Sequence, residues 1–207
     1  EKQISGTNEM LRSVAFADAN LGIAVGDSGV IRTSDGGTTW DRMLIASSLW
    51  GISFPHTSIG TAVGSGGIIL RTTDGGDTWS LQTSGVQSLL TAVHFVDVNL
   101  GYVVGLSGVI LKTTNAGATW VPQSSGTTLG FYAVHFHNAD RGIAAGGGPL
   151  GPGVMRWTTN GGQTWNSQTS GSVLTRHYGV KMLNPTTAVA VGANIRRTTD
   201  NGATWPD

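Results

Sequence analysis

The 207-residue sequence has no cysteine, few charged side chains and no long apolar run. Without cysteine there can be no disulfide, thiol nucleophile or thiolate zinc site. Charged residues form only 12% of the chain, and the 12 basic and 12 acidic residues cancel, so we expect no nucleic-acid partner. No run approaches the roughly 18 apolar residues of a membrane helix, and Glu1 opens the chain without a basic and apolar leader, so we expect no membrane insertion.

Tryptophan, by contrast, marks a repeat. Five of the seven tryptophans are spaced 39, 41, 45 and 40 residues apart, at Trp40, Trp79, Trp120, Trp165 and Trp205. Each ends the phrase Thr-x-Asp/Asn-x-Gly-x-Thr-Trp, as in Thr113-Thr-Asn-Ala-Gly-Ala-Thr-Trp120. A period near 40 residues indicates stacked supersecondary units, and there are five of them here.

Each unit contains four predicted strands. Short β-branched and aromatic runs alternate with glycine turns, as in residues 93–96, 101–105 and 109–113. No segment sustains apolar residues at helical spacing for ten residues, and frequent glycine would weaken any helix. Four strands per repeat are typical of a propeller blade. We therefore predict an all-β, five-bladed β-propeller of four-stranded antiparallel blades.

The two ends of the chain suggest how the ring closes. Gln82-Thr-Ser-Gly85 follows Trp79 by three residues, and Gln3-Ile-Ser-Gly6 matches that segment. We predict that the N-terminal strand completes the outer strand of the last blade and so removes the exposed sheet edges. The chain is then one domain, 1–207, with blades at about 10–45, 48–84, 89–125, 130–170 and 175–207 plus 1–6.

The third position of the repeated phrase carries either aspartate or asparagine: Asp35, Asp74, Asn115, Asn160 and Asp200. A calcium site or a catalytic acid needs the charge, whereas a turn needs only a short side-chain oxygen that accepts backbone N–H groups. We interpret these residues as hairpin residues and expect the tryptophan that ends each phrase to pack between neighbouring sheets.

The phrase resembles the Asp-box, or bacterial-neuraminidase repeat, of sialidases and other β-propellers. The longer unit Gly101–Trp120 resembles the repeat of photosystem II stability and assembly factors, and so do its four counterparts. That resemblance implies a non-enzymatic propeller that binds a protein, in an extracytoplasmic place: periplasmic, lumenal or secreted. Those factors are seven-bladed, whereas five units are counted here.

One position of the predicted inner strands breaks the symmetry of the repeat. It carries Arg12, Trp50, Thr91, Tyr132 and Tyr178. If the strands run as in WD-repeat propellers, this ring opens onto the central channel, on the face opposite the Asp-boxes. Aromatic rings with a polar end suit a sugar, a peptide or a protein surface, but the same side chains could simply plug the channel. The ligand-binding candidates are Arg12, Trp50, Tyr132, Arg176, His177 and Tyr178.

The predicted third strands carry a second ring, which is basic: Arg32, Arg71, Lys112 and Arg197, with Arg156 and Arg196 beside it. These residues could form an anion or acidic-protein patch. Alternatively, their long side chains could lie along neighbouring sheets and cover tryptophan faces.

Four of the five histidines gather on the predicted inner strands: His94, His135, His137 and His177. Three histidines can bind zinc, but Lys181 at an equivalent position is a poor neighbour for a cation. We expect neither a metal nor another cofactor.

The acidic residues do not favour an enzyme. A glycosidase normally needs two juxtaposed carboxylates, whereas both glutamates, Glu1 and Glu9, lie in the first ten residues. We predict a binding or scaffold protein that presents its channel mouth to a protein or peptide. The alternative is a lectin-like carbohydrate binder, and a sialidase-like glycosidase is the third reading.

Overall fold

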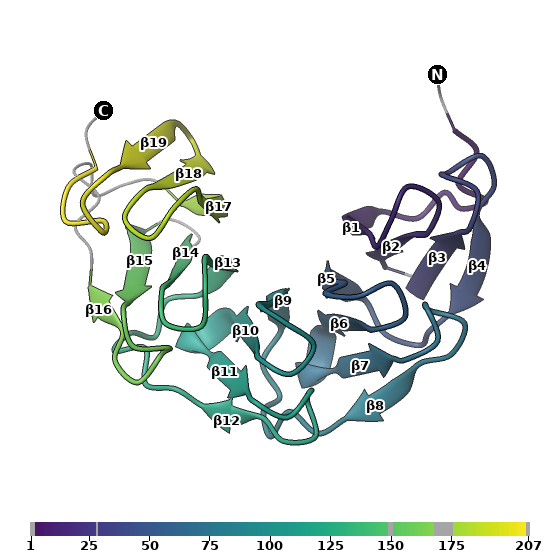
Figure 1. Ribbon diagram of the computed structural model, residues 1–207, viewed down its shortest axis with the longest axis horizontal. Helices are drawn as coiled ribbons and strands as arrows, with labels where there is room; N and C mark the ends of the chain where they lie inside the picture. The colour runs from purple at the N-terminus through teal and green to yellow at the C-terminus, as the bar shows by residue number, and fades with distance from the viewer. Residues whose placement is uncertain (1–2, 28, 149–150, 168–175, 206–207) are drawn as a thin grey trace.

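A computed structural model describes residues 3–27, 29–148, 151–167 and 176–205 of the chain. The described residues form nineteen strands in five antiparallel sheets, joined by turns and two short 3-10 turns. Figure 1 shows the sheets following one another around an arc, with β1, β5, β9, β13 and β17 nearest its centre. We number these sheets as blades 1 to 5 in chain order. The predicted all-β, five-bladed propeller architecture is confirmed.

The strands of each blade follow one another in sequence and in space, from the innermost to the outermost. Blades 1 to 4 have four strands each, and blade 5 has three. The strands are β1 (Leu11–Phe16), β2 (Gly22–Gly26), β3 (Gly29–Thr33), β4 (Asp41–Leu44), β5 (Leu49–Ser53), β6 (Gly60–Gly64), β7 (Ile69–Thr72), β8 (Ser80–Gln82), β9 (Leu90–Phe95), β10 (Gly101–Gly105), β11 (Ile110–Thr113), β12 (Val121–Pro122), β13 (Phe131–Phe136), β14 (Gly142–Gly147), β15 (Gly153–Thr158), β16 (Asn166–Ser167), β17 (His177–Met182), β18 (Ala188–Gly192) and β19 (Ile195–Thr198). The 3-10 turns η1 (Ser65–Gly67) and η2 (Leu106–Gly108) follow β6 and β10.

The second strand of each blade lies in the core of the molecule. Every residue of β2, β6, β10 and β14 is buried, because each of these strands lies inside its sheet and packs against a neighbouring blade. Gly101 begins β10 where a Cβ would meet the ring of Phe95 at 2.6 Å. In blade 5 the glycine becomes Ala188 and the phenylalanine becomes Met182, a smaller and more flexible side chain that makes room for the extra methyl group.

The Asp-box turns are held by a repeated set of hydrogen bonds. In blade 1, Asp35 Oδ1 accepts from the Thr39 amide at 2.9 Å and from Thr33 Oγ1 at 2.7 Å. The pKa of the Asp35 carboxyl is lowered to about 2, mainly by the hydrogen bond from the Thr39 amide and then by the one from the Thr39 hydroxyl. In blade 3, Asn115 Oδ1 accepts the same amide bond and its Nδ2 donates to Thr119 Oγ1 at 2.9 Å. The turn therefore requires only the side-chain oxygen, which aspartate and asparagine both supply.

In blades 1 to 4, the tryptophan that ends the Asp-box packs against the phenylalanine of the inner strand of the same blade. Trp120 meets Phe95 edge to face, with ring centroids 6.0 Å apart, and is 8% exposed. Trp165 meets Phe136 in the same way at 5.8 Å. Each pair contributes to the core shared with the preceding blade, as the sequence predicts.

The ring closure stays a prediction. Figure 1 shows blade 1 and blade 5 on opposite sides of a gap, and in the described residues no strand pairing joins them. Residues Gln3–Gly6 lie against blade 1, where the Trp40 indole N–H donates to Gln3 Oε1 at 3.3 Å. The assignment of the whole chain to a single closed domain is likewise untested.

Replacing Asp74 tests the reading of the Asp-box. We expect Asp74→Asn to leave the melting temperature nearly unchanged, because Asn115 and Asn160 make the equivalent amide bond in other blades. Asp74→Ala should lower it, since the Thr78 amide and hydroxyl both lose their acceptor. Thermal unfolding followed by circular dichroism measures both changes. Equal losses for the two variants would mean that the charge itself matters.

Candidate ligand-binding site at the inner-strand ring

The structure brings the five residues of the predicted ring to one hollow. This hollow has a volume of about 300 Å³ and is lined by Met10, Leu11, Arg12, Trp50, Thr91, Tyr132 and Tyr178. Each ring residue is the second residue of an inner strand, and together these strands form the inner edge of the arc (Figure 1). Five different blades therefore contribute one side chain each to the same place.

A β-bulge in every blade explains how these side chains leave the sheet. In blade 1, Leu11 pairs with Gly26 and Ser13 pairs with Val25, so Arg12 has no partner in the ladder. The same shift leaves the other four ring residues unpaired in their blades. A bulged residue is released from the alternation of the strand and can be turned in a new direction. The identity of the ring residues is therefore not fixed by strand pairing, whereas paired residues recur from one unit to the next.

A glycine of each second strand, paired with the first residue of the inner strand, makes room for the bulge. A Cβ on Gly105 would lie 2.3 Å from the carbonyl oxygen of Leu89, and one on Gly64 would lie 2.1 Å from that of Ser48. The equivalent glycines in the other blades show the same close approach. Sequence reasoning missed the bulge, although a glycine at this position in all five units was a signal for it.

One half of the hollow is an arginine on an indole. The Arg12 guanidinium lies over the Trp50 ring at 4.0 Å from its centroid. Its position is set by Asp27, whose Oδ1 lies 2.7 Å from Arg12 Nη2 and also accepts from Ser48 Oγ at 2.7 Å. The Ser48 bond and then the Arg12 bond hold the pKa of Asp27 below its usual value. The positive charge of Arg12 is therefore balanced within the protein.

The other half joins two phenols and a second arginine. The rings of Tyr132 and Tyr178 are 5.6 Å apart at 45°, and the Arg176 guanidinium lies 5.8 and 5.9 Å from them. A hydrogen bond from Arg176 Nε to the Gly148 carbonyl, 2.7 Å long, fixes the position of the guanidinium. In the described part of the chain no carboxylate forms an ion pair with Arg176. Arg176 does not itself line the hollow, but its charge lies beside the two tyrosine rings that do.

Thr91 forms the floor between these two halves. Its side chain is 6% exposed, and its Oγ1 donates to the carbonyl oxygens of Phe131 at 2.7 Å and Val104 at 3.1 Å. This residue joins blades 3 and 4 and contributes little surface to a ligand.

His177, one of the predicted ligand-binding residues, lies outside the lining of the hollow, and its role in a site stays a prediction. The side chain is fully buried and does not line the hollow. It occupies the position of Leu49 and Leu90 in other blades, one residue before the bulge, where the side chain points into the core. Burial, followed by the charge of Arg196, lowers the pKa of His177, so the imidazole is neutral near pH 7.

The basic ring on the third strands links neighbouring blades. Arg32 Nε donates to the Gly75 carbonyl at 2.9 Å, and Lys112 Nζ donates to the Gly161 carbonyl at 2.7 Å; both acceptors lie in the Asp-box of the next blade. Arg156, 9% exposed, donates to the carbonyl of residue 125 at 2.6 Å. These bonds favour the reading in which the long basic side chains lie along neighbouring sheets.

His94 and His135 form a half-buried pair between blades 3 and 4. Their ring centroids are 4.5 Å apart, His94 Nε2 lies 3.1 Å from the Phe136 carbonyl oxygen, and His135 Nδ1 accepts from the Met182 amide at 3.3 Å. In the described residues no three histidine or carboxylate side chains come together as a metal site requires. The two imidazoles instead link the backbones of successive blades.

The comparisons with known proteins agree with this fold. A family model described as Photosynthesis system II assembly factor YCF48 matches residues 2–82 and 80–207. The chain belongs to this family. The resemblance noted from the Asp-box repeat is therefore confirmed. No curated protein matches the chain.

Several solved structures share the architecture. "YCF48 bound to D1 peptide" is 17% identical with a TM-score of 0.68, covering 96% of this chain and 80% of that one. YCF48 from Cyanidioschyzon merolae is 19% identical with a TM-score of 0.67, covering 97% and 85%. The GH74 enzyme of Niastella koreensis is 17% identical with a TM-score of 0.79, but this chain covers only 38% of it. At these identities the likeness shows the fold alone.

Gly105→Ala tests the role of the bulge glycine. We expect it to cost about 1–3 kcal/mol of unfolding free energy, because the new Cβ has to displace the backbone of Leu89. Gly148→Ala is the matched control, since its Cβ would meet its nearest neighbour at an ordinary 3.5 Å. Urea denaturation compares the two variants. Equal stability of both would show that the bulge does not depend on the glycine.

The half-buried histidine pair predicts a loss of stability in mild acid. Burial is the main cause that lowers the pKa of His94 to about 4 and that of His135 to about 3. The unfolded chain, in which histidine has its ordinary pKa of about 6.5, takes up protons first. The unfolding free energy should therefore fall as the pH drops from about 6.5 towards 4, with the Asp-box carboxylates contributing only at lower pH.

The measurement is the urea midpoint at pH 7.0 and pH 4.5. The decrease between these two values should be smaller in His135→Asn than in the wild type. His56→Asn, which removes an exposed imidazole, is the control and should keep the full decrease. An undiminished decrease in His135→Asn would contradict the assignment to this pair.

Proposed function

We propose that the protein binds an exposed peptide segment of a partner protein in the inner-strand hollow and catalyses no reaction there. The observation that carries this proposal is the convergence of Arg12, Trp50, Tyr132 and Tyr178 around one hollow of about 300 Å³, with Arg176 beside the two tyrosine rings. Aromatic and arginine side chains supply much of the binding energy at protein interfaces. The site residues are the five just named.

The arrangement of charge supports a peptide with an acidic or carboxylate group beside an apolar one. Arg12 is balanced by Asp27, so the Trp50 half offers a flat apolar surface. Arg176 has no carboxylate partner in the described residues and can form a charge-assisted hydrogen bond with a ligand anion. A family relative was solved "bound to D1 peptide", which is consistent with a peptide ligand for a propeller of this kind.

The carboxylates of the chain argue for a binder over an enzyme. None of the residues that line the hollow is an aspartate or a glutamate. Asp35 and Asp200 are tied to the threonines of their own turns, and Asp27 is tied to Arg12 and Ser48. A glycosidase needs two free carboxylates facing each other across the substrate. The GH74 enzymes share the propeller fold, and fold alone does not imply their chemistry.

Carbohydrate is the second candidate ligand. An indole and two phenols in one hollow can also stack on sugar rings, and Trp50 and Tyr178 would serve that role too.

Family membership favours an extracytoplasmic location, whether periplasmic, lumenal or secreted. In the described residues no helix has the length and apolar character needed to cross a bilayer.

A phage-displayed random peptide library, selected on the immobilised wild-type protein, tests the proposal. We expect enriched peptides whose affinity falls about tenfold or more in Trp50→Ala and in Tyr178→Ala, the effect of losing roughly 1.4 kcal/mol or more at a central aromatic contact. Tyr178→Phe should keep most of the affinity, because the aromatic face remains. Leu81→Ala, on an exposed outer strand, is the surface control.

The outcomes separate the candidates. Peptides that bind all variants equally would place the interaction elsewhere on the surface. A library without binders, together with a glycan array on which several sugars bind and Trp50→Ala abolishes that binding, would favour the carbohydrate reading instead.

A further inference from the structure

Both arginines beside the inner-strand hollow are fixed by the turn between the second and third strands of a blade, which we call the 2–3 turn. In blade 1 this turn follows β2 and contains Asp27, which pairs with Arg12 of the same blade. In blade 4 it follows β14 and contains Gly148, whose carbonyl accepts from Arg176 of the next blade. The same kind of turn therefore positions two guanidinium groups with different chemistry.

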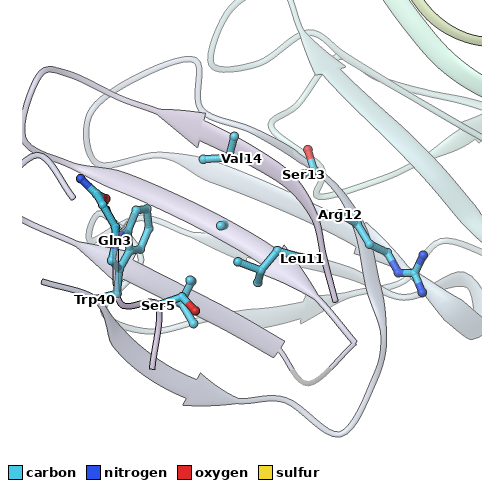
Figure 2. Close-up of a pocket in the computed structure, with 9 residues that line it drawn as sticks. Gln3, Ser5, Leu11, Arg12, Ser13, Val14 and Trp40 are labelled. Atoms are coloured by element: carbon cyan, nitrogen blue, oxygen red, sulfur yellow. The ribbon is translucent and has the colours of Figure 1, made fainter. Parts of the chain in front are cut away.

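Asp27 holds Arg12 through a carboxylate. Its Oδ1 accepts from Arg12 Nε at 3.0 Å and Nη2 at 2.7 Å, and from Ser48 Oγ at 2.7 Å. Figure 2 shows the Arg12 side chain extending away from Leu11, with its guanidinium at the far end. That guanidinium lies 4.0 Å from the centroid of the Trp50 ring. Beside Trp50, the positive charge is thus matched by a negative charge of the protein.

The 2–3 turn of blade 4 holds Arg176 through the backbone alone. Arg176 Nε donates to the Gly148 carbonyl at 2.7 Å, and a Cβ on Gly147 would lie 3.2 Å from Arg176 Cγ. Its Nη1 lies 3.4 Å from the Tyr178 hydroxyl, and in the described residues no carboxylate pairs with it. A carbonyl therefore fixes the guanidinium and leaves its full charge in place.

This difference between the two turns comes from the sequence. Blade 4 carries Gly146-Gly-Gly-Pro-Leu-Gly-Pro-Gly153 here, a stretch without an acidic residue, whereas blade 1 carries Asp27. The stretch is anchored to the sheet, since Gly147 pairs with Gly153 and its amide donates to the Gly130 carbonyl at 2.9 Å. The Gly148 carbonyl is consequently held in a fixed place next to Arg176.

The tyrosine rings do not use up the charge of Arg176. Its guanidinium lies 5.8 Å from the Tyr132 ring and 5.9 Å from the Tyr178 ring, close to the limit of about 6 Å for a cation–π contact. Arg12 lies much nearer to its indole, at 4.0 Å. The guanidinium of Arg176 is thus the one that stays available to a ligand.

We propose that the two 2–3 turns set the charge preference of the hollow. Gly148 keeps the side beside Tyr132 and Tyr178 selective for an anionic group of the ligand. Asp27 keeps the side beside Trp50 selective for an uncharged group. The inference rests on the proposed function, because it concerns the ligand of the same hollow. Asp27 and Gly148 are positioning residues that act through the two arginines.

Elementary electrostatics gives the two sides opposite preferences. A carboxylate near Arg176 gains a charge-assisted hydrogen bond from a guanidinium that is already fixed, so little side-chain freedom is lost on binding. The same carboxylate near Arg12 also meets the negative charge of Asp27, which cancels most of the attraction.

Two small probes test this preference directly. Phenylacetate and phenylacetamide share one aromatic ring and differ in the charge of the head group. In NMR titrations of the wild type, we expect phenylacetate to bind about threefold to tenfold more tightly and to shift the amide signals of Tyr132 and Tyr178. The preference should shrink in about 0.5 M NaCl, because salt screens exposed charges.

Asp27→Asn should extend the preference to the other side of the hollow. The asparagine keeps an oxygen that can accept from Arg12 and Ser48 but has no charge, so phenylacetate should now also shift the Trp50 indole signal. Asp97→Asn is the matched control and should behave as the wild type. Asp97 accepts two turn amides, as Asn138 does in the next blade, so the control makes the same change of charge in a turn that tolerates it.

Gly148→Asp should have the reverse effect. It adds a carboxylate to the turn that holds Arg176 and should bring the affinities for the two probes close together. A Cβ at this position meets its nearest neighbour at 3.5 Å, so the turn has room for a side chain. Gly148→Asn, of the same size but uncharged, should keep the preference of the wild type. Thermal unfolding checks that every variant is folded.

The outcomes separate this inference from the proposed function. Equal or undetectable binding of the two probes to the wild type would overturn the inference, and so would an unchanged preference in folded Asp27→Asn and Gly148→Asp. Selected peptides that need Trp50 and Tyr178 but show no charge preference would likewise overturn it while the proposed function stands. A probe preference that follows the variants, together with a peptide library without binders, would support it and reject the peptide as ligand.

Discussion

The packing of one blade on the next is the interaction on which the rest of this structure depends. A single four-stranded sheet exposes two faces, and neither its second strand nor its tryptophan can be buried without a neighbour. Stacking five such sheets buries every residue of β2, β6, β10 and β14. The same stacking brings the inner strands side by side, so that one position from each blade meets at the centre of the arc (Figure 1).

The bulge at that position separates function from architecture. Residues in the ladder must fit the neighbouring blade, and they recur from unit to unit as valine, isoleucine, phenylalanine and glycine. Arg12, Trp50 and Tyr178 are outside the ladder and have no such constraint. A repeat protein can therefore vary the chemistry of its central hollow while keeping its core, which is consistent with one fold serving both assembly factors and glycosidases.

The comparison of His177 with Tyr178 shows where sequence reasoning reached its limit. Both residues lie at the start of the last inner strand, and alignment of the repeats places Tyr178 with the ring. Only the bulge decides that Tyr178 is 58% exposed while its neighbour His177 is fully buried. Similarly, the sequence could not tell whether the third-strand cations bind anions or link blades, because their acceptors are backbone carbonyls of the next repeat.

What the sequence determined by itself is local and periodic: the strands, the Asp-box turns, the five units and the family. These follow from alternation, turn chemistry and spacing, which act within about 40 residues and recur five times. The tertiary structure decided how the units meet: the arc of blades, the bulged ring, and the position of Arg176 beside Tyr132 and Tyr178 without a carboxylate partner in the described residues. Those properties depend on contacts between residues in different blades, whose distances no spacing in a single chain specifies.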